Sequence, residues 1–489
     1  MSFRTFIFRA GAVAFAAVLI FSAVGGPDYF LRPTAQPTQP AASYPTPFLA
    51  GFTPAPAANL NPGSGSAADH FNKAEEYSKA GNYQQAIDEY TQAIESFPAF
   101  AQAYRSRARA YHELGKYDLS IADYTRAIEL NPTDAEAYFY RAVAYGTAGD
   151  SARAVADYTK VIELAPNAAI AYDFRGSAYS VLGENDQALA DFGKAVEIDP
   201  GYVQAYFDRA VVYNRLGNYE QALADYTTAV TLAPEDARVY GNRGNTYFNL
   251  LKYEEAIADY DKAIELDPNY ILAYVNRALV YGTQGDYERA VADYDQAEQL
   301  GGDDLNLRLN RGLAYANLGK PDRAIADYTQ AITAGPDSAV AHNLRGLSYT
   351  DQADYEKAVA DFTTALTLDP ANVEFYANRG DAYRGWGKIE FALADYDRAI
   401  ELVSDDDKAY VRRGNAYVDS GDYEKAIADY TQALAVNPDN VSAYTNRGIV
   451  YYNQRKYQET VADLTKAIEL DPTNTNSYNT RAVAYFALA

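Results

Sequence analysis

Apolar side chains recur every three or four positions along most of this chain, as they do on one face of an α-helix. Tyr104, Ala108 and Tyr111 share such a face in one stretch. After a break at Gly115, a second face begins with Ile121 and continues at the same helical spacing. The pattern predicts two consecutive helices joined by a short turn.

This helix pair repeats with a period of 34 residues, and a proline marks most repeats. The spacing predicts twelve repeats over residues 67–474 and a half repeat over residues 475–489. Gly302 and Ser404 stand where a proline is skipped, so the register is kept throughout. The prolines in register are Pro98, Pro132, Pro166, Pro200, Pro234, Pro268, Pro336, Pro370, Pro438 and Pro472. A single hairpin cannot bury its apolar stripe, so we expect the repeats to stack into an all-α solenoid.

The second helices pair a small residue with a large aromatic residue four positions later. One tyrosine also recurs in all thirteen first helices, from Tyr77 to Tyr485, which helps to explain the total of 46 tyrosines. We interpret these residues as packing positions. The small and large residues include Ala154 with Tyr158, Ala188 with Phe192, Ala222 with Tyr226, Ala256 with Tyr260, Ala290 with Tyr294 and Ala324 with Tyr328.

The period and its residues resemble the tetratricopeptide repeat family over residues 67–489. In the second repeat the resemblance rests on Tyr104, Ala108, Tyr111, Gly115, Tyr117, Tyr124, Ala127 and Pro132. It implies a right-handed superhelix of antiparallel helix pairs, whose concave surface is lined by the first helices and binds peptides or protein segments. Family members are mostly scaffolds and adaptors, so the resemblance implies an interaction protein and not an enzyme.

Twelve first helices carry an arginine where many family members have leucine, and in eleven of them an aspartate follows sixteen residues later. The arginines could form a basic ladder for an acidic ligand. The constant offset favours a structural reading instead, in which each arginine forms a bidentate ion pair within its hairpin or with a neighbour. We call these residues the ladder arginines and ladder aspartates; they include Arg243 with Asp259, Arg277 with Asp293, and Arg311 with Asp327.

Asparagine precedes the ladder arginine in several repeats, and a side-chain amide can pair with both the N–H and the C=O of an extended peptide. The resemblance implies peptide binding at these positions, since tetratricopeptide domains use asparagine in this way. The alternative is that the amides cap local backbone or face water. The residues are Asn242, Asn276, Asn310, Asn378 and Asn446.

Apolar residues alternate with these amides on the predicted concave face. An apolar groove would suit a hydrophobic or amphipathic segment, although some of these side chains could belong to the core. One predicted stretch comprises Phe139, Tyr140, Val143, Phe174, Phe207 and Val211, and the other Val275, Leu279, Leu309, Leu313, Leu344 and Leu347. The lysine-rich clamp with which some family members hold acidic chaperone tails is not visible, so we do not expect binding of such tails.

The N-terminus reads as an export signal. Arg4 and Arg9 precede an uncharged, mostly apolar run over residues 10–27, close in length to both a cleavable signal and a bilayer span of about 20 residues. We predict that residues 1–26 are a signal anchor or a signal peptide, with retention favoured. Basic residues stay on the cytoplasmic side, so the repeats would be exported. A buried N-terminal helix of a cytosolic protein is the alternative.

Residues 27–66 contain nine prolines and only two charged residues, which predicts a flexible Pro-rich linker. The export signal and linker style suggest a bacterial protein, single-pass in the membrane or secreted after cleavage.

Composition argues against several kinds of binding and catalytic site. The net charge of −24 argues against binding nucleic acid, and the chain has no cysteine and three histidines. We therefore expect no cofactor, no catalytic site and no metal site. Acidic runs at residues 303–304 and 405–407 could bind calcium, but capping of the following helices is favoured.

The function we predict is an interaction scaffold for a protein or peptide of unknown identity outside the cytoplasm. The alternatives are an accessory subunit of a cell-envelope enzyme or polysaccharide assembly complex, and a passive spacer. The last residues, including Tyr485 and Phe486, would leave an apolar edge, which an imperfect cap, a longer chain or self-association would explain.

Overall fold

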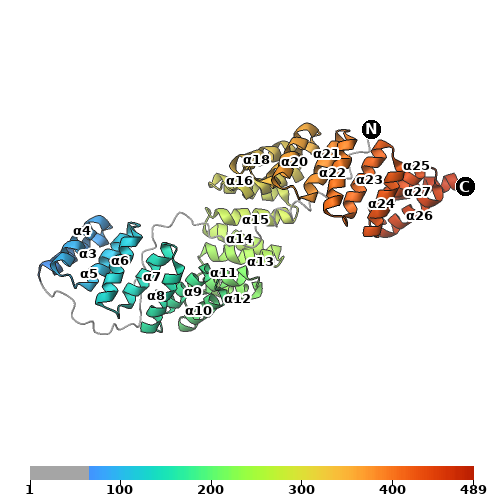
Figure 1. Ribbon diagram of the computed structural model, residues 1–489. Helices are drawn as coiled ribbons and strands as arrows, with labels where there is room; N and C mark the ends of the chain where they lie inside the picture. The colour runs from blue at the N-terminus through green and yellow to red at the C-terminus, as the bar shows by residue number, and fades with distance from the viewer. Residues whose placement is uncertain (1–64) are drawn as a thin grey trace. The chain divides into compact units, whose positions relative to one another are not determined.

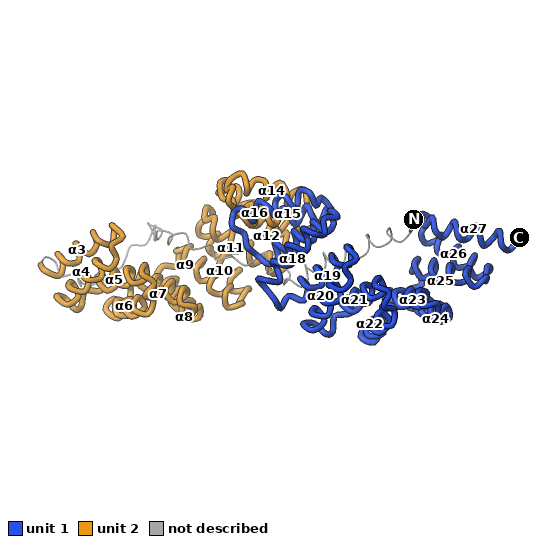
Figure 2. Tube along the Cα trace, turned by 90° about the horizontal axis from the view of Figure 1, so that it is seen from above, with its two compact units in different colours: residues 1–24, 277–489 blue, residues 25–276 orange. Residues whose placement is uncertain are grey.

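The computed structural model describes residues 65–489, and this part of the chain consists of 25 helices with no strand. Eleven pairs of consecutive helices pack against each other as antiparallel hairpins, from α3 with α4 to α25 with α26, and the single helix α27 follows (Figure 1). The described residues divide into two compact units, which are coloured differently in Figure 2: unit 1 holds residues 277–489 and unit 2 holds residues 65–276. The boundary falls within α15 (Ile271–Thr283).

The described helices of unit 2 are α3 (Ser66–Lys79), α4 (Tyr83–Ser96), α5 (Ala101–Glu113), α6 (Tyr117–Leu130), α7 (Ala135–Thr147), α8 (Ser151–Leu164), α9 (Ala169–Val181), α10 (Asn185–Ile198), α11 (Val203–Arg215), α12 (Tyr219–Leu232), α13 (Ala237–Asn249) and α14 (Tyr253–Leu266). Those of unit 1 are α16 (Tyr287–Gln299), α17 (Leu305–Asn317), α18 (Pro321–Ala334), α19 (Ala339–Asp351), α20 (Tyr355–Leu368), α21 (Val373–Gly385), α22 (Ile389–Leu402), α23 (Asp407–Ser420), α24 (Tyr423–Val436), α25 (Val441–Asn453), α26 (Tyr457–Leu470) and α27 (Thr475–Leu488).

The turn inside each hairpin follows from its sequence. Gly149, between α7 and α8, has a φ of 85°, a left-handed conformation that glycine adopts without a Cβ clash. Asp150 then caps α8, because its side chain accepts a hydrogen bond from the backbone N–H of Arg153. Leu251, Ala353 and Arg455 adopt the same positive φ in three other turns.

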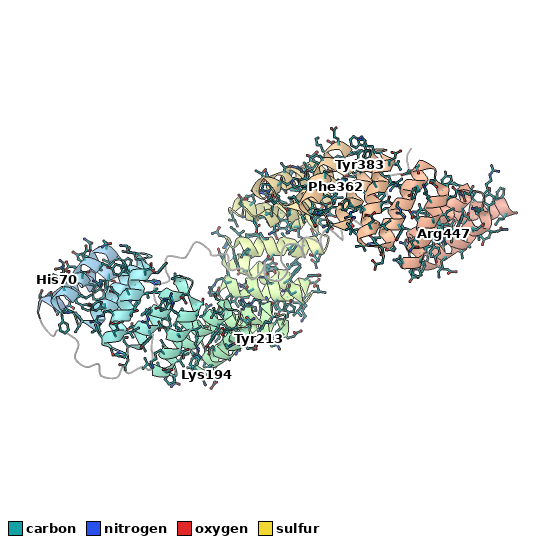
Figure 3. The ribbon with its side chains drawn as sticks, in the orientation of Figure 1. His70, Lys194, Tyr213, Phe362, Tyr383 and Arg447 are labelled. Atoms are coloured by element: carbon teal, nitrogen blue, oxygen red, sulfur yellow. The ribbon has the colours of Figure 1, made fainter. Side chains whose placement is uncertain are left out.

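Packing inside a hairpin depends on a small residue in the first helix beneath a buried aromatic ring of the second. A Cβ added to Gly346 of α19 would lie only 2.8 Å from a ring carbon of Phe362, which is labelled in Figure 3. Tyr260 lies over Gly244 at the same distance. These rings therefore fix how closely the two helices approach.

The odd-numbered helices form the inner layer of each unit. Within unit 2, α9 contacts α11 and α11 contacts α13; within unit 1, α19 contacts α21 and α21 contacts α23. Within neither unit do two even-numbered helices of the described residues approach one another to the same extent. The closer spacing of the first helices places them on the concave side, as the family resemblance implied.

The last helix has an uncovered face. Phe486 is 83% exposed, and Val483 and Tyr485 are about half exposed. The model thus shows the apolar edge that the sequence led us to expect.

In the described part of the chain, no helix is both long and apolar enough to cross a bilayer. The predicted anchor or signal peptide over residues 1–26 lies outside the described residues, as does the predicted linker up to residue 64. The first helix starts at Ser66, which we had placed at the end of that linker.

Candidate functional site

Eleven of the twelve ladder arginines form structural ion pairs with a ladder aspartate. In all eleven pairs, Nε and one terminal nitrogen of the arginine donate to the two carboxylate oxygens of the ladder aspartate. Arg243 and Asp259 illustrate the geometry, with both bonds 2.7 Å long. Burial raises the pKa of Asp259, and Arg243 opposes that shift. These arginines are therefore not a ladder for an acidic ligand.

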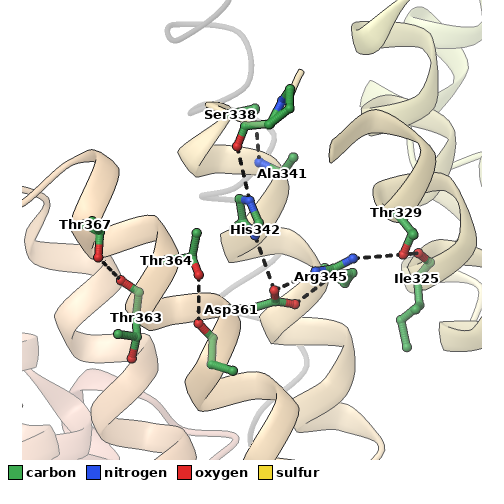
Figure 4. A network of polar contacts seen from close by, with 12 residues as sticks. Ile325, Thr329, Ser338, Ala341, His342, Arg345, Asp361, Thr363, Thr364 and Thr367 are labelled. Carbon is green, nitrogen blue, oxygen red and sulfur yellow. Dashed lines mark hydrogen bonds and ion pairs between the residues drawn. The ribbon is translucent and has the colours of Figure 1, made fainter. Parts of the chain in front are cut away.

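A third contact joins the ladder to the preceding repeat, and the sequence analysis missed it. Arg345 in α19 donates to Asp361 in α20 and, through its other terminal nitrogen, to the hydroxyl of Thr329 in α18 (Figure 4). Arg311 and Arg413 contact aspartates at the equivalent place. Each such arginine ties three helices together.

The predicted asparagines mostly bind other side chains of the inner layer. Nδ2 of Asn276 donates to Oδ1 of Asn245 at 2.8 Å, and the hydroxyl of Tyr260 donates to the same oxygen. Asn446 makes the equivalent bond to Asn415.

The other three predicted asparagines differ. Asn378 donates to Asn343, Asn242 donates to the backbone oxygen of Arg238, and Asn310 is half-buried. Three of the five amides thus link neighbouring first helices, and Asn242 bonds the backbone within its own helix. Peptide binding at these positions stays a prediction.

The predicted apolar stretches divide into core and surface. Phe139, Val275 and Leu309 are at least 91% buried, and Tyr140 and Leu344 are buried too, so for these residues the core alternative holds. Half-buried side chains remain available on the inner layer at Val143, Phe174, Phe207, Val211, Leu279, Leu313 and Leu347.

A regular contact joins successive first helices on the inner layer. The residue just before a first helix reaches back to the residue 29 positions earlier, which lies two places before a ladder arginine or, in the first repeat, before Lys73. The chemistry of the pair varies, while the contact recurs. Examples are Phe71 with Phe100, Arg105 with Asp134, Asp173 with Tyr202, Gly241 with Tyr270, and Thr445 with Asn474.

The pair of Asp173 and Tyr202 belongs to an acidic site on α9 and α11. Asp173 is 2% exposed, and its Oδ2 accepts a 3.0 Å hydrogen bond from the Tyr202 hydroxyl. Asp208 of α11 accepts a hydrogen bond from Gln204. Burial raises the pKa of Asp173 well above its usual range and that of Asp208 to about 6, and Asp208 adds to the shift at Asp173. We call Asp173 and Asp208 the acidic pair.

Two polar atoms beside the acidic pair have no hydrogen-bond partner. Oδ1 of Asp173 and the hydroxyl of Tyr226 are both buried and unsatisfied. Asp208 is close enough to Tyr226 to help raise the pKa of that hydroxyl, although burial is the larger cause. Buried polar atoms are rarely left in this state.

In unit 1 the corresponding inner face is internally neutralised. Arg412 of α23 lies 3.3 Å from Glu374 and 3.4 Å from Asp381 of α21. Asp381 also accepts a 2.6 Å hydrogen bond from the Tyr396 hydroxyl, and Arg384 pairs with Asp419.

The acidic runs and the histidines have structural roles. Asp304 and Asp406 accept hydrogen bonds from the first turns of α17 and α23, so the capping alternative holds for both. His70 contacts Glu89, and His342 lies between Asp361 and the backbone oxygen of Pro336.

Comparison with family models decides what kind of chain this is. Models described as TPR repeat match residues 176–217, 212–250, 346–385, 380–419 and 414–455. Models described as tetratricopeptide repeat match residues 237–270 and 441–474, 71–135 and 275–339, and 123–156. The chain belongs to the tetratricopeptide repeat family. Proteins of this family generally act as protein-interaction scaffolds and are typically not enzymes.

Solved tetratricopeptide repeat structures resemble the chain over parts of its length. YrrB, titled a TPR protein with an unusual peptide-binding site, is 27% identical, with 38% of this chain and 95% of YrrB covered and a TM-score of 0.35. A protein from Parabacteroides merdae is 23% identical, with coverages of 51% and 98% and a TM-score of 0.43. Yeast Tom70 is 17% identical, with coverages of 86% and 95% and a TM-score of 0.41. No curated protein matches the chain.

Proposed function

We propose that this tetratricopeptide repeat protein is a scaffold that holds a peptide or an extended protein segment along the inner layer of its first helices. The observation that carries the proposal is the contrast between constant and variable positions. The ladder pairs recur in eleven repeats, whereas the half-buried inner positions change from repeat to repeat, as from Val211 to Leu279 and Asp381. Uniform packing with a variable inner surface suits recognition of one particular segment.

Selection from a displayed library of random dodecapeptides on the purified full chain tests this function. Enriched peptides should lose at least tenfold in affinity when Val211→Asp and Leu313→Asp are introduced on the inner layer. A matched control, Thr231→Asp with Thr364→Asp, adds the same charge on exposed positions of α12 and α20 and should retain binding. Failure to enrich any peptide, or equal loss in the control, would count against the proposal.

We also propose that the repeats work outside the cytoplasm, with residues 1–26 kept as a membrane anchor and residues 27–66 acting as a spacer. The support is the order of basic residues, apolar run and Pro-rich segment in the sequence. Cell fractionation and sequencing of the mature N-terminus test this. A start before Arg9 in the membrane fraction is the expected result, a start at Gly26 in the soluble exported fraction would indicate secretion, and a cytosolic chain would refute export.

A further inference from the structure

The acidic pair stands where other repeats of this protein have arginine. Asp173 lies two residues before a ladder arginine, the place of Arg105 in α5. Asp208 lies one residue before a ladder arginine, the place of Arg412 in α23. Arg105 is held by Asp134 and Glu136, and Arg412 by Glu374 and Asp381. At the acidic pair the negative charges are present and the arginine of either pattern is missing.

The nearby Arg238 does not replace the arginine that is missing at the acidic pair. Arg238 of α13 attracts Asp208 and works against the rise in its pKa, but its guanidinium forms two hydrogen bonds to Asp236. It also lies over the ring of Phe207, 5.6 Å from the centroid. Burial still dominates at Asp208, so the compensation from Arg238 is incomplete.

Unsatisfied atoms and aromatic rings complete the site. Oδ1 of Asp173 and the hydroxyl of Tyr226 each lack a partner, which leaves one acceptor and one hydroxyl unused beside the acidic pair. Phe174 and Phe207 are half-buried on the same two helices, next to Asp173 and Asp208 in sequence. An aromatic ring beside a carboxylate suits a cationic side chain, because the ring packs on the aliphatic stem and attracts the charge.

We propose that the inner face of α9 and α11 accepts the lysine or arginine side chain of the bound segment, with Asp173 and Asp208 as its counter-charges. This inference rests on the proposed function and names the chemistry that part of the groove selects. The bound cation would balance the charge of Asp173 and Asp208, as Arg412 balances that of Glu374 and Asp381 in unit 1. Entry of the cation requires a small movement of Tyr202, whose hydroxyl covers Asp173.

The test uses the peptides enriched on the full chain. Binders that occupy this site should carry a lysine or arginine whose replacement by norleucine lowers affinity at least tenfold, which corresponds to about 1.4 kcal/mol. The variant Asp173→Asn with Asp208→Asn should lower affinity for the parent peptide to the same degree and remove the difference between the two peptides. Asparagine keeps the shape of aspartate and can still accept the hydrogen bond from Tyr202.

The matched control is Glu254→Gln with Glu255→Gln, which removes two exposed carboxylates of α14 in the same unit. It should bind both peptides like the unaltered chain. Binders with no basic residue, or binders whose affinity falls equally in the control, would overturn the cation site while leaving the proposed function intact. Absence of any enriched peptide would overturn both. The norleucine comparison on the unaltered chain stands even if the double variant fails to fold.

Discussion

The inner faces around α9 and α11 in unit 2 and around α21 and α23 in unit 1 share one framework and differ in charge balance. Both have ladder pairs of the same geometry, as at Arg209 with Asp225 and Arg379 with Asp395. Around α21 and α23 the carboxylates form ion pairs with Arg412, whereas around α9 and α11 no ion pair among the described residues engages Asp173 or Asp208, and Arg238 attracts Asp208 only from a distance. The ladder pairs therefore keep one geometry in both regions, while the charges of the inner positions differ between them.

The largest effect should come from the shared framework and be alike in both regions. Asp225→Ala and Asp395→Ala each leave a half-buried guanidinium without its counter-charge, which we expect to cost about 3–5 kcal/mol in the free energy of unfolding. Urea unfolding of the full chain measures it. Replacing both partners, as in Arg379→Met with Asp395→Leu, should cost clearly less than Asp395→Ala. Simple additivity, here or in a cycle on Arg277 and Asp293, would contradict the ion-pair reading.

Replacing Arg412 should leave carboxylates of α21 in unit 1 without an ion pair, as Asp173 and Asp208 are in unit 2. Arg412→Met leaves Glu374 and Asp381 without their base, so we expect a loss of about 1–3 kcal/mol at neutral pH. The exposed pair of Arg126 and Glu129 supplies the control, since Arg126→Met should cost no more than about 1 kcal/mol. Thermal and urea unfolding of the two variants measure the difference. Equal losses would mean that Arg412 is only a surface charge.

Removing the charges of the acidic pair should raise the free energy of unfolding, whereas Arg412→Met should lower it. The size of this gain should depend on pH. A raised carboxyl pKa means that the folded state holds more protons than the unfolded state between pH 4 and 6, so stability falls as the pH rises through this window. The variant Asp173→Asn with Asp208→Asn lacks this loss. At pH 7 without ligand it should be more stable than the unaltered chain, by on the order of 1–3 kcal/mol.

At pH 4.5 that gain should shrink, because the acidic pair is then largely protonated. The groups nearest the pair, Tyr202, Tyr226 and Arg238, keep their protonation state over this range. Urea unfolding at both pH values provides the measurement, with Glu254→Gln and Glu255→Gln as the control. A variant that is less stable than the unaltered chain at pH 7 would mean that the pair stabilises the fold.

The smallest effect concerns two turns elsewhere in the chain, one in each unit, and both should respond alike. Leu251 and Arg455 hold positive φ values of 59° and 64°, which cost energy in residues that carry a Cβ. Leu251→Gly and Arg455→Gly should each raise stability by no more than about 1 kcal/mol, since glycine removes the strain at some cost in unfolded-state entropy. The matched control, Gly217→Ala at φ 77°, should lower stability. A loss in either glycine variant would show that its turn carries little strain.

Repetition explains how much of this fold could be predicted. The 34-residue period gave the hairpins, and the constant offset of sixteen residues gave the ladder pairs, because a contact made in every repeat leaves the same residues in every repeat. The third arginine contact was missed because its partner is threonine in some repeats and aspartate in others, as at Thr329 and Asp295, and Gly193 offers no partner at all.

The inner surface was harder to predict for the same reason. Phe139 and Leu309 seemed available to a ligand, and both are buried in the core. Phe139 packs against Tyr158 and Phe174, and Leu309 lies in a cluster with Tyr328 and Leu344. A recurring contact between residues 29 positions apart could not be read from the sequence either. The offset is constant, but each pair uses different chemistry, so no single residue type repeats. The acidic pair could not be predicted from the sequence, because Asp173 and Asp208 occupy different places in successive repeats. They come near each other only when α9 packs beside α11.

Gly193 has a mechanical consequence. Where other repeats offer a hydroxyl or carboxylate to the next ladder arginine, this glycine offers only its Cα, and an added Cβ would still lie 3.7 Å from the terminal nitrogen of Arg209. The junction between α10 and α11 therefore lacks the hydrogen bond that joins a ladder arginine to the preceding repeat at other junctions, as from Arg345 to Thr329. When the chain is pulled, α10 and α11 should separate early. The groove would therefore deform most easily where the acidic pair lies.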